Sequence, residues 1–163
     1  MAEGYKKLEI YNLAYAQSLR VHRMSLSLPK FETYEEGSQI RRSAKSICAN
    51  IVEGHALRKY KNEYLHYLYR AYGSCEETIF HLEELFESGS LTDRALYDSL
   101  QTEYNKLSSK LFSFIQAVER HYDTPNYLKE PDELYNKQET RNSKRETNNL
   151  KQLHETTRPE TES

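Results

Sequence analysis

Cysteine, proline and glycine are all scarce in this chain, which holds two, four and five of them among its 163 residues. Neither Cys48 nor Cys75 has a CxxC partner, and both lie in helical patterns, so we expect small buried hydrophobic residues in a reducing compartment. The few glycines form no glycine-rich loop of the kind that binds phosphate groups.

Long apolar runs are also missing. No segment approaches the roughly 20 consecutive apolar residues that span a bilayer. At the N-terminus, Glu3, Lys6, Lys7 and Glu9 interrupt any run that would resemble a signal peptide. The sequence therefore predicts a soluble, cytoplasmic protein.

Aliphatic side chains nearly disappear after residue 122, where the chain becomes polar and charged. Such a stretch cannot bury enough apolar surface to offset the backbone entropy lost on ordering, roughly 1–2 kcal/mol per residue. We therefore predict one folded domain over residues 1–122 and a polar, disordered tail over residues 123–163.

No set of residues with catalytic or metal-ligand spacing stands out. Glu63 and His66 form one half of the Glu-x-x-His pattern of di-iron bundles, but the required second copy is absent. The other histidines form no ligand-spaced pair, and nothing places serine, histidine and aspartate as a triad. We predict no metal, no cofactor and no enzymatic activity.

The apolar residues that are present repeat with helical spacing, and glycine and proline fall where helices should end. We predict helices over residues 5–26, 34–54 and 59–87, and a fourth from a Thr92 cap to about residue 122. The second would begin with a Thr33-x-x-Glu36 capping box and end at a left-handed Gly54. The expected fold is all-α, an antiparallel up-down-up-down four-helix bundle.

The first predicted helix carries two apolar stripes. One stripe consists of Leu8, Tyr11, Tyr15 and Leu19, and the other of Ile10, Leu13, Val21 and Met24. A helix that is apolar on two sides is buried on two sides, which one small bundle cannot supply. An oligomer would supply the second contact.

Charge is distributed unevenly along a predicted domain that is formally neutral. Residues 41–70 hold seven basic side chains and two acidic ones, whereas residues 76–103 hold eight acidic side chains and one basic one. The candidate nucleic-acid-binding residues are Arg41, Arg42, Lys45, Arg58, Lys59 and Lys61. They would contact phosphates, or they would form salt bridges with the acidic stretch of a neighbouring subunit.

Residues 58–72 interleave five tyrosines with basic side chains, a pattern that suits either base stacking or packing within a bundle or ring. Asn50 and Glu53 lie one turn apart, where they form either an acid–amide pair or the polar end of a helix. Gly73 and Ser74 interrupt a strong helical pattern, which suggests the close approach of another helix.

Several of these residues form a recognisable pattern. A proline after the first helix precedes a glutamine, paired arginines and a Ser-Ile-x-Ala-Asn-Ile-x-Glu-Gly run, followed by a mid-helix Gly-Ser and two glutamates. Here these are Pro29, Gln39, Arg41, Arg42, Ser46, Ile47, Ala49, Asn50, Ile51, Glu53, Gly54, Gly73, Ser74, Glu76 and Glu77. Over about three quarters of its length, the chain resembles the bacterial four-helix-bundle family encoded in intervening sequences of large-subunit rRNA genes.

The resemblance implies a homo-oligomeric ring, typically a homopentamer. It also implies a relationship to the accessory proteins of diversity-generating retroelements, which bind nucleic acid and a reverse transcriptase. Two functions follow as hypotheses. The first is a non-enzymatic accessory protein that binds RNA or DNA, a reverse transcriptase or both through a basic surface, and the second is a protein-interaction ring that binds no nucleic acid.

Overall fold

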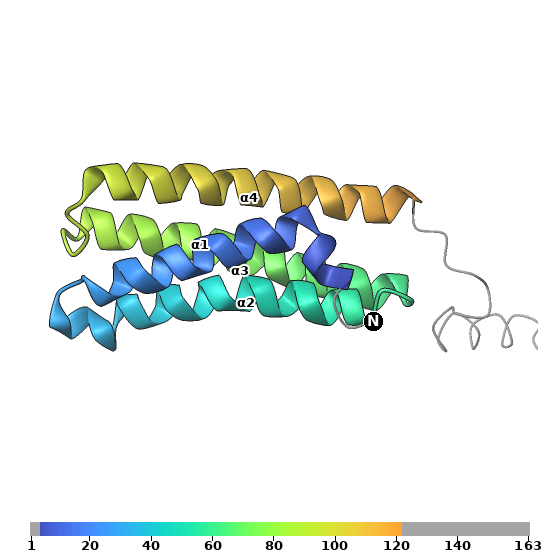
Figure 1. Cartoon of the computed structure of the whole chain (residues 1–163), viewed down its shortest axis with the longest axis horizontal. Coiled ribbons are helices and arrows are strands. Elements are labelled where there is room, and N and C mark those ends of the chain that lie inside the picture. Colours follow the sequence, from blue (N-terminus) through green and yellow to red (C-terminus); the bar gives the residue numbers. More distant parts are fainter. Residues whose placement is uncertain (1–3, 122–163) are drawn as a thin grey trace, which may run out of the picture. The chain divides into compact units, whose positions relative to one another are not determined.

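The computed structural model describes residues 4–121, which form a four-helix bundle without strands (Figure 1). Its helices are α1 (Glu9–Leu26), α2 (Glu36–Ala56), α3 (Lys61–Glu87) and α4 (Arg94–His121), with short 3-10 helices η1 (Gly4–Lys7) and η2 (Lys30–Thr33) before α1 and α2. The α1–α2 and α3–α4 connections lie at one end of the bundle and the α2–α3 turn at the other (Figure 1). The predicted all-α, up-down-up-down fold is confirmed, whereas the predicted tail lies outside the described residues.

The core is formed by the apolar stripe of each helix. The stripe of α4 is continuous and consists of Leu100, Tyr104, Leu107, Leu111, Ile115 and Val118. It faces Tyr64, Leu68 and Leu82 of α3, which are also buried. Full burial of each aliphatic side chain stabilises the fold by roughly 1.5–3 kcal/mol relative to its exposure. None of the described helices has the length and hydropathy of a membrane span.

The N-terminal helix differs from its prediction because it is interrupted. Leu8 adopts an extended backbone between η1 and α1, and the Asn12 side chain donates a hydrogen bond to the Lys6 carbonyl at 2.9 Å. Tyr5 of η1 then packs edge-on against Tyr11, with 4.8 Å between ring centroids. Of the two apolar stripes of α1, the chain buries one and leaves Tyr15 and Leu19 of the other exposed.

The capping box predicted at Thr33 is wrong. Thr33 is the last residue of η2, α2 begins only at Glu36, and no side chain caps its first N–H groups. The backbone of η2 instead comes so close to α2 that a Cβ on Gly37 would collide with the Glu32 carbonyl oxygen. The close contact between η2 and the first turn of α2 therefore determines where α2 begins.

Gly54 does not end α2 as predicted, because the helix continues to Ala56 and the only described residue with positive φ is Gly89. Gly54 instead allows close packing of α2 against α3. A Cβ on residue 54 would lie 3.0 Å from the Tyr67 Cβ and 3.3 Å from the Tyr64 Cδ2. Gly54 thus lets two tyrosines of α3 lie directly against the α2 backbone.

The predicted Thr92 cap of α4 is also wrong by one residue. Asp93 caps this helix, since its Oδ1 accepts a hydrogen bond from the Leu96 N–H at 2.9 Å. The preceding turn uses Gly89 at φ 80°, a conformation that favours glycine, as the Ser-Gly-Ser sequence there indicates. Elsewhere α3 begins at Lys61, two residues later than predicted.

Candidate functional site

Four of the six predicted basic site residues are exposed and free of acidic partners. Arg42 and Lys45 lie on the solvent side of α2, and Arg58 and Lys59 lie in the α2–α3 turn. Within residues 4–121, none of the four forms an ion pair; only Arg58 makes a hydrogen bond, to the His55 carbonyl at 2.8 Å. We call these four residues the α2 basic surface. It extends along α2 for roughly 20 Å between Lys45 and Arg58.

The other two predicted site residues hold parts of the chain together. The Arg41 guanidinium donates to Ser25 Oγ of α1 at 3.1 Å and to the Thr33 carbonyl at 2.7 Å. The Lys61 ammonium donates to the Glu119 carbonyl near the end of α4 at 2.8 Å. Both side chains therefore connect elements within one chain.

The tyrosines of residues 58–72 have several separate environments. Tyr64 is buried beside Gly54, and Tyr69 donates a hydrogen bond to Glu119 at 2.7 Å. Tyr67 lies under Arg70, whose Cζ is 5.8 Å from the ring centroid. Tyr60 remains exposed next to Lys59. Packing therefore accounts for most of these rings, and Tyr60 adds an aromatic face to the α2 basic surface.

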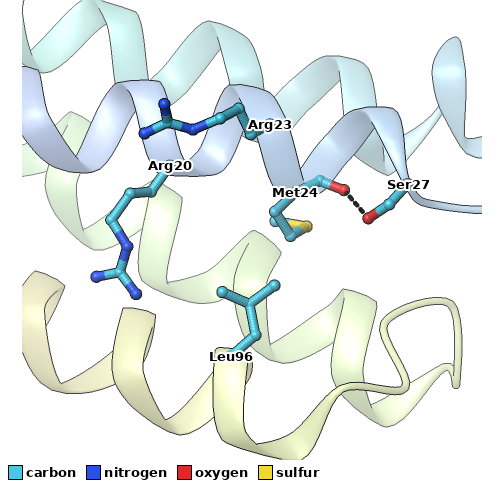
Figure 2. A pocket seen from close by; sticks show the side chains of 5 residues that line it. All are labelled: Arg20, Arg23, Met24, Ser27 and Leu96. Carbon is cyan, nitrogen blue, oxygen red and sulfur yellow. Dashed lines mark hydrogen bonds between the residues drawn. The ribbon is translucent and has the colours of Figure 1, made fainter.

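A second cationic feature, which no sequence pattern indicated, is a pocket of ≈ 390 Å³ between α1 and α4. Its lining consists of Arg20, Arg23, Met24, Ser27 and Leu96, and we call it the arginine pocket (Figure 2). Met24 and Leu96 face each other across it, while Arg20 reaches toward α4 (Figure 2). The Arg20 guanidinium is fixed by Gln17 Oε1 at 2.9 Å and Ser99 Oγ at 2.7 Å.

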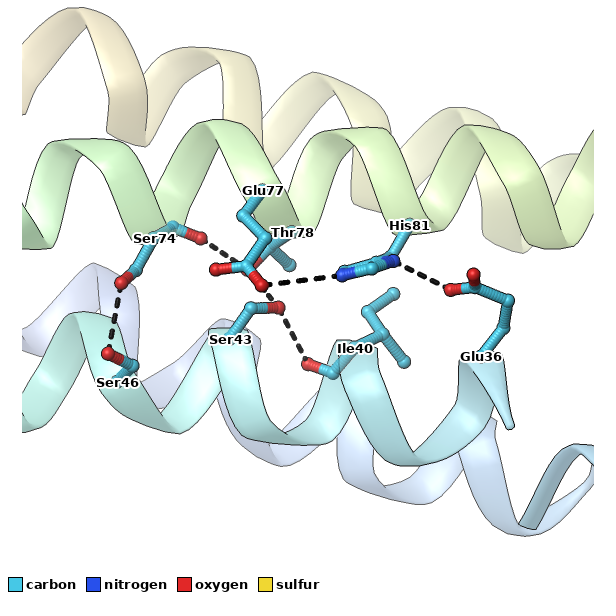
Figure 3. Close-up of polar contacts among 8 residues, drawn as sticks. All are labelled: Glu36, Ile40, Ser43, Ser46, Ser74, Glu77, Thr78 and His81. Atoms are coloured by element: carbon cyan, nitrogen blue, oxygen red, sulfur yellow. Dashed lines mark hydrogen bonds and ion pairs between the residues drawn. The ribbon is translucent and has the colours of Figure 1, made fainter. Parts of the chain in front are cut away.

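Small polar residues of α2 and α3 form a polar ladder, partly or fully buried, between the two helices (Figure 3). Ser46 Oγ lies 2.9 Å from Ser74 Oγ, and Thr78 Oγ1 lies 2.9 Å from Ser43 Oγ. Asn50 donates to the carbonyl and hydroxyl oxygens of Ser46 at 2.9 and 3.0 Å. Asn50 thus bonds back within α2 rather than to the helix end, and the Asn50–Glu53 pair is not assembled because Glu53 is exposed.

An imidazole extends the ladder to the beginning of α2. His81 of α3 is buried, with Nδ1 2.6 Å from Glu36 Oε2 and Nε2 3.5 Å from Glu77 Oε1 (Figure 3). Glu36 is the first residue of α2, so this contact connects the start of α2 to α3. The buried Glu32 of η2 makes a similar link, since it accepts a hydrogen bond from Ser90 Oγ at 2.5 Å.

Gly73 and the two cysteines differ in their surroundings. Gly73 is exposed, and a Cβ there would meet nothing within 4 Å, so no helix of the same chain approaches it. Burial raises the pKa of Cys48 to about 11 and that of Cys75 to about 12, which keeps both thiols protonated. Over residues 4–121, no group of three His, Cys, Asp or Glu side chains is arranged to hold a metal ion.

The fold and its polar ladder define a small all-α protein, a four-helix bundle with a basic second helix. The chain matches the family of 23S rRNA-intervening sequence proteins over residues 6–113, and it belongs to that family. It is also similar in fold to a protein of unknown function from the S23 ribosomal protein family of Bacteroides thetaiotaomicron. The two share 23% identity and a TM-score of 0.60 over 66% of this chain and 95% of that chain. No curated protein matches the sequence.

Proposed function

We propose that this protein is a non-enzymatic, homo-oligomeric accessory protein, a ring of about five bundles, that holds nucleic acid on the α2 basic surface. The observation that carries the proposal is that Arg42, Lys45, Arg58 and Lys59 are exposed without any carboxylate partner among the described residues. Membership of a family named for an rRNA intervening sequence supports an RNA-related role.

The chemistry of the surface suits a single strand better than a base-specific site. Each neutralised phosphate of a single strand contributes about 0.7 to the slope of log K against log salt, so four contacts per subunit would give a slope of about −3. Tyr60 lies exposed between Lys59 and Lys61, where a base can stack on its ring. No element of this surface discriminates one base from another, so we expect little sequence preference.

Electrophoretic or anisotropy titration of the full chain with labelled single-stranded and duplex RNA and DNA, at two salt concentrations, tests this proposal. We expect Arg42→Ala/Lys45→Ala to weaken single-strand binding at least about tenfold at low salt and to reduce the salt slope by about 1.4. Arg41 is left intact in this variant because its hydrogen bonds to Ser25 and Thr33 stabilise the fold.

The matched control removes the same charge from α4. Arg94 lies 3.0 Å from Asp98 and Lys106 lies 3.9 Å from Glu103, so each of these cations has a carboxylate beside it. Arg94→Ala/Lys106→Ala should leave binding within about twofold of the unmodified protein. An equal loss of affinity in both variants would show that binding depends only on the net charge of the protein. Absence of binding at low salt would refute the nucleic-acid role.

One observation favours the alternative of a protein-interaction ring. Leu26, Phe31 and Tyr34, around the α1–α2 connection, are 70%, 65% and 87% exposed. Exposed apolar and aromatic side chains are typical of protein contacts, and a reverse transcriptase is the partner that the family resemblance suggests. Salt separates the two functions, because an apolar contact persists at salt concentrations that dissociate a polyanion.

A further inference from the structure

One exposed aromatic side chain projects from the glutamate-rich second half of α3. Phe80 of α3 is 54% exposed, and Glu77 and Glu84 lie one turn before and one turn after it. Residues three and four apart on a helix share a face, so the ring is flanked by two exposed carboxylates, of which Glu77 also lies 3.5 Å from His81 Nε2. We call these three residues the α3 knob.

The arginine pocket has the opposite chemistry. Its floor is apolar, with Met24 buried and Leu96 partly buried, and its rim carries two guanidinium groups. Arg20 is fixed by Gln17 and Ser99 but keeps unused N–H donors, and Arg23 is exposed without a partner among the described residues. An apolar group flanked by carboxylates is therefore the ligand that fits this pocket.

We propose that the α3 knob of one copy of this chain docks into the arginine pocket of a second copy. Phe80 would cover Met24 and Leu96, and the two knob glutamates would pair with Arg20 and Arg23. The inference rests on the proposed homo-oligomeric function and specifies which surfaces meet. Because the knob and the pocket are different surfaces of the bundle, the contact is heterologous, and repetition of it generates a ring or a filament.

The positions of the two surfaces along the bundle favour a closed ring. Arg41 of α2 bonds to Ser25, which is next to the pocket residue Met24. Two residues further along α2, Ser43 contacts Thr78, which is two residues before Phe80 of the α3 knob. The knob and the pocket therefore lie at similar heights on the bundle, so that copies with parallel long axes, joined by this contact, would be related with little rise. Rotation without rise closes a ring rather than a helix.

The oligomeric mass of the full chain, measured by light scattering or analytical ultracentrifugation, tests the contact. Phe80→Asp should raise the dissociation constant at least about tenfold, as expected for a buried aromatic anchor. Phe112→Asp is the matched control, since Phe112 of α4 is 44% exposed and lies outside both surfaces. Circular dichroism should show unchanged helix content in both variants because both side chains are already exposed.

Mixing two variants tests the heterologous geometry. Phe80→Asp leaves a working pocket, and Arg20→Glu/Arg23→Glu leaves a working knob while repelling the knob of any partner. At a concentration where the unmodified chain assembles and the weakened variants do not, each variant alone should be monomeric, but a mixture should form a one-to-one heterodimer because only one contact can form. Absence of that heterodimer, or an oligomer unaffected by Phe80→Asp, would overturn the knob-and-pocket contact. A monomeric unmodified chain would instead refute the homo-oligomeric part of the proposed function.

Discussion

Adjacent side chains on a helix point about 100° apart, and Arg41 and Arg42 show the consequence. Arg41 turns toward α1 and bonds to Ser25 and the Thr33 carbonyl, whereas Arg42 faces solvent without a partner among the described residues. The sequence shows two equivalent arginines at the start of a basic helix. Only their surroundings separate the side chain that stabilises the α1–α2 connection from the one available to a ligand.

Two helical glycines of this chain also differ only in their surroundings. A Cβ on Gly37 would collide with the backbone of Glu32, which cannot move without displacing η2. Gly73 sits in the interior of α3 with open space around it. A helix-interior glycine costs about 0.5–1 kcal/mol relative to alanine, so Gly73 weakens the isolated chain without any compensating contact inside it.

Alanine at these two positions should therefore have opposite effects on the free energy of unfolding, measured by urea denaturation. Gly73→Ala should stabilise the chain by about 0.5–1 kcal/mol. Gly37→Ala should destabilise it by more than about 1 kcal/mol, because the steric clash exceeds the gain in helix propensity. Destabilisation by Gly73→Ala, together with a lower oligomeric mass, would show that another subunit packs on this glycine.

At the scale of helices, the polar ladder and the apolar core have different effects on the α2–α3 pair. Ile47 and Leu68 are completely buried in the core, and truncation of such a side chain to alanine costs about 2–5 kcal/mol. A ladder hydrogen bond contributes only about 0.5–1.5 kcal/mol. The ladder therefore adds little stability, but displacement of α3 by one turn would separate its paired hydroxyls and leave Thr78 only its bond to the Ser74 carbonyl, so the ladder favours one register of the two helices.

A double-mutant cycle at Ser43 and Thr78 tests this role. Thr78→Val should lower the free energy of unfolding by about 1 kcal/mol, since valine keeps the shape and removes the hydroxyl. Adding Ser43→Ala to Thr78→Val should cost less than Ser43→Ala alone, because the contact between the two hydroxyls is already lost. Urea unfolding of the unmodified protein, the two single variants and the double variant gives the four free energies of unfolding. Additive changes in these free energies would contradict direct coupling between the two hydroxyls.

The elements themselves were predictable where apolar spacing decides them. The α4 stripe from Leu100 to Val118 and the face of α3 could be predicted because a helical period over 20 or more residues allows no other arrangement. The start of α2 could not, because a contact between η2 and Gly37 overrides the Thr33 capping signal. The arginine pocket was invisible because Arg20 and Leu96, 76 positions apart, meet only in the folded bundle.

At the scale of the whole molecule, the unpaired cations and the aromatic ring flanked by carboxylates lie on different elements. The α2 basic surface has no acidic partners among the described residues, while the α3 knob presents an aromatic ring between carboxylates. A single bundle with four free cations binds a polyanion only weakly at physiological salt. In the ring that we propose, repetition of the same surface would multiply the contact, because after the first subunit binds, the others would bind the same strand intramolecularly.

This coupling predicts that assembly and nucleic-acid affinity change together on long strands but not on short ones. Phe80→Asp, which removes the knob and none of the α2 basic surface, should weaken binding to a long single-stranded RNA about 100-fold or more. Its affinity per subunit for an oligonucleotide of about six nucleotides should stay the same, since such a strand reaches only one subunit. Anisotropy titrations with both lengths, alongside Phe112→Asp, make the comparison. An equal loss on both lengths would mean that Phe80 contacts the nucleic acid itself, and no loss on either would mean that the ring contributes nothing to binding.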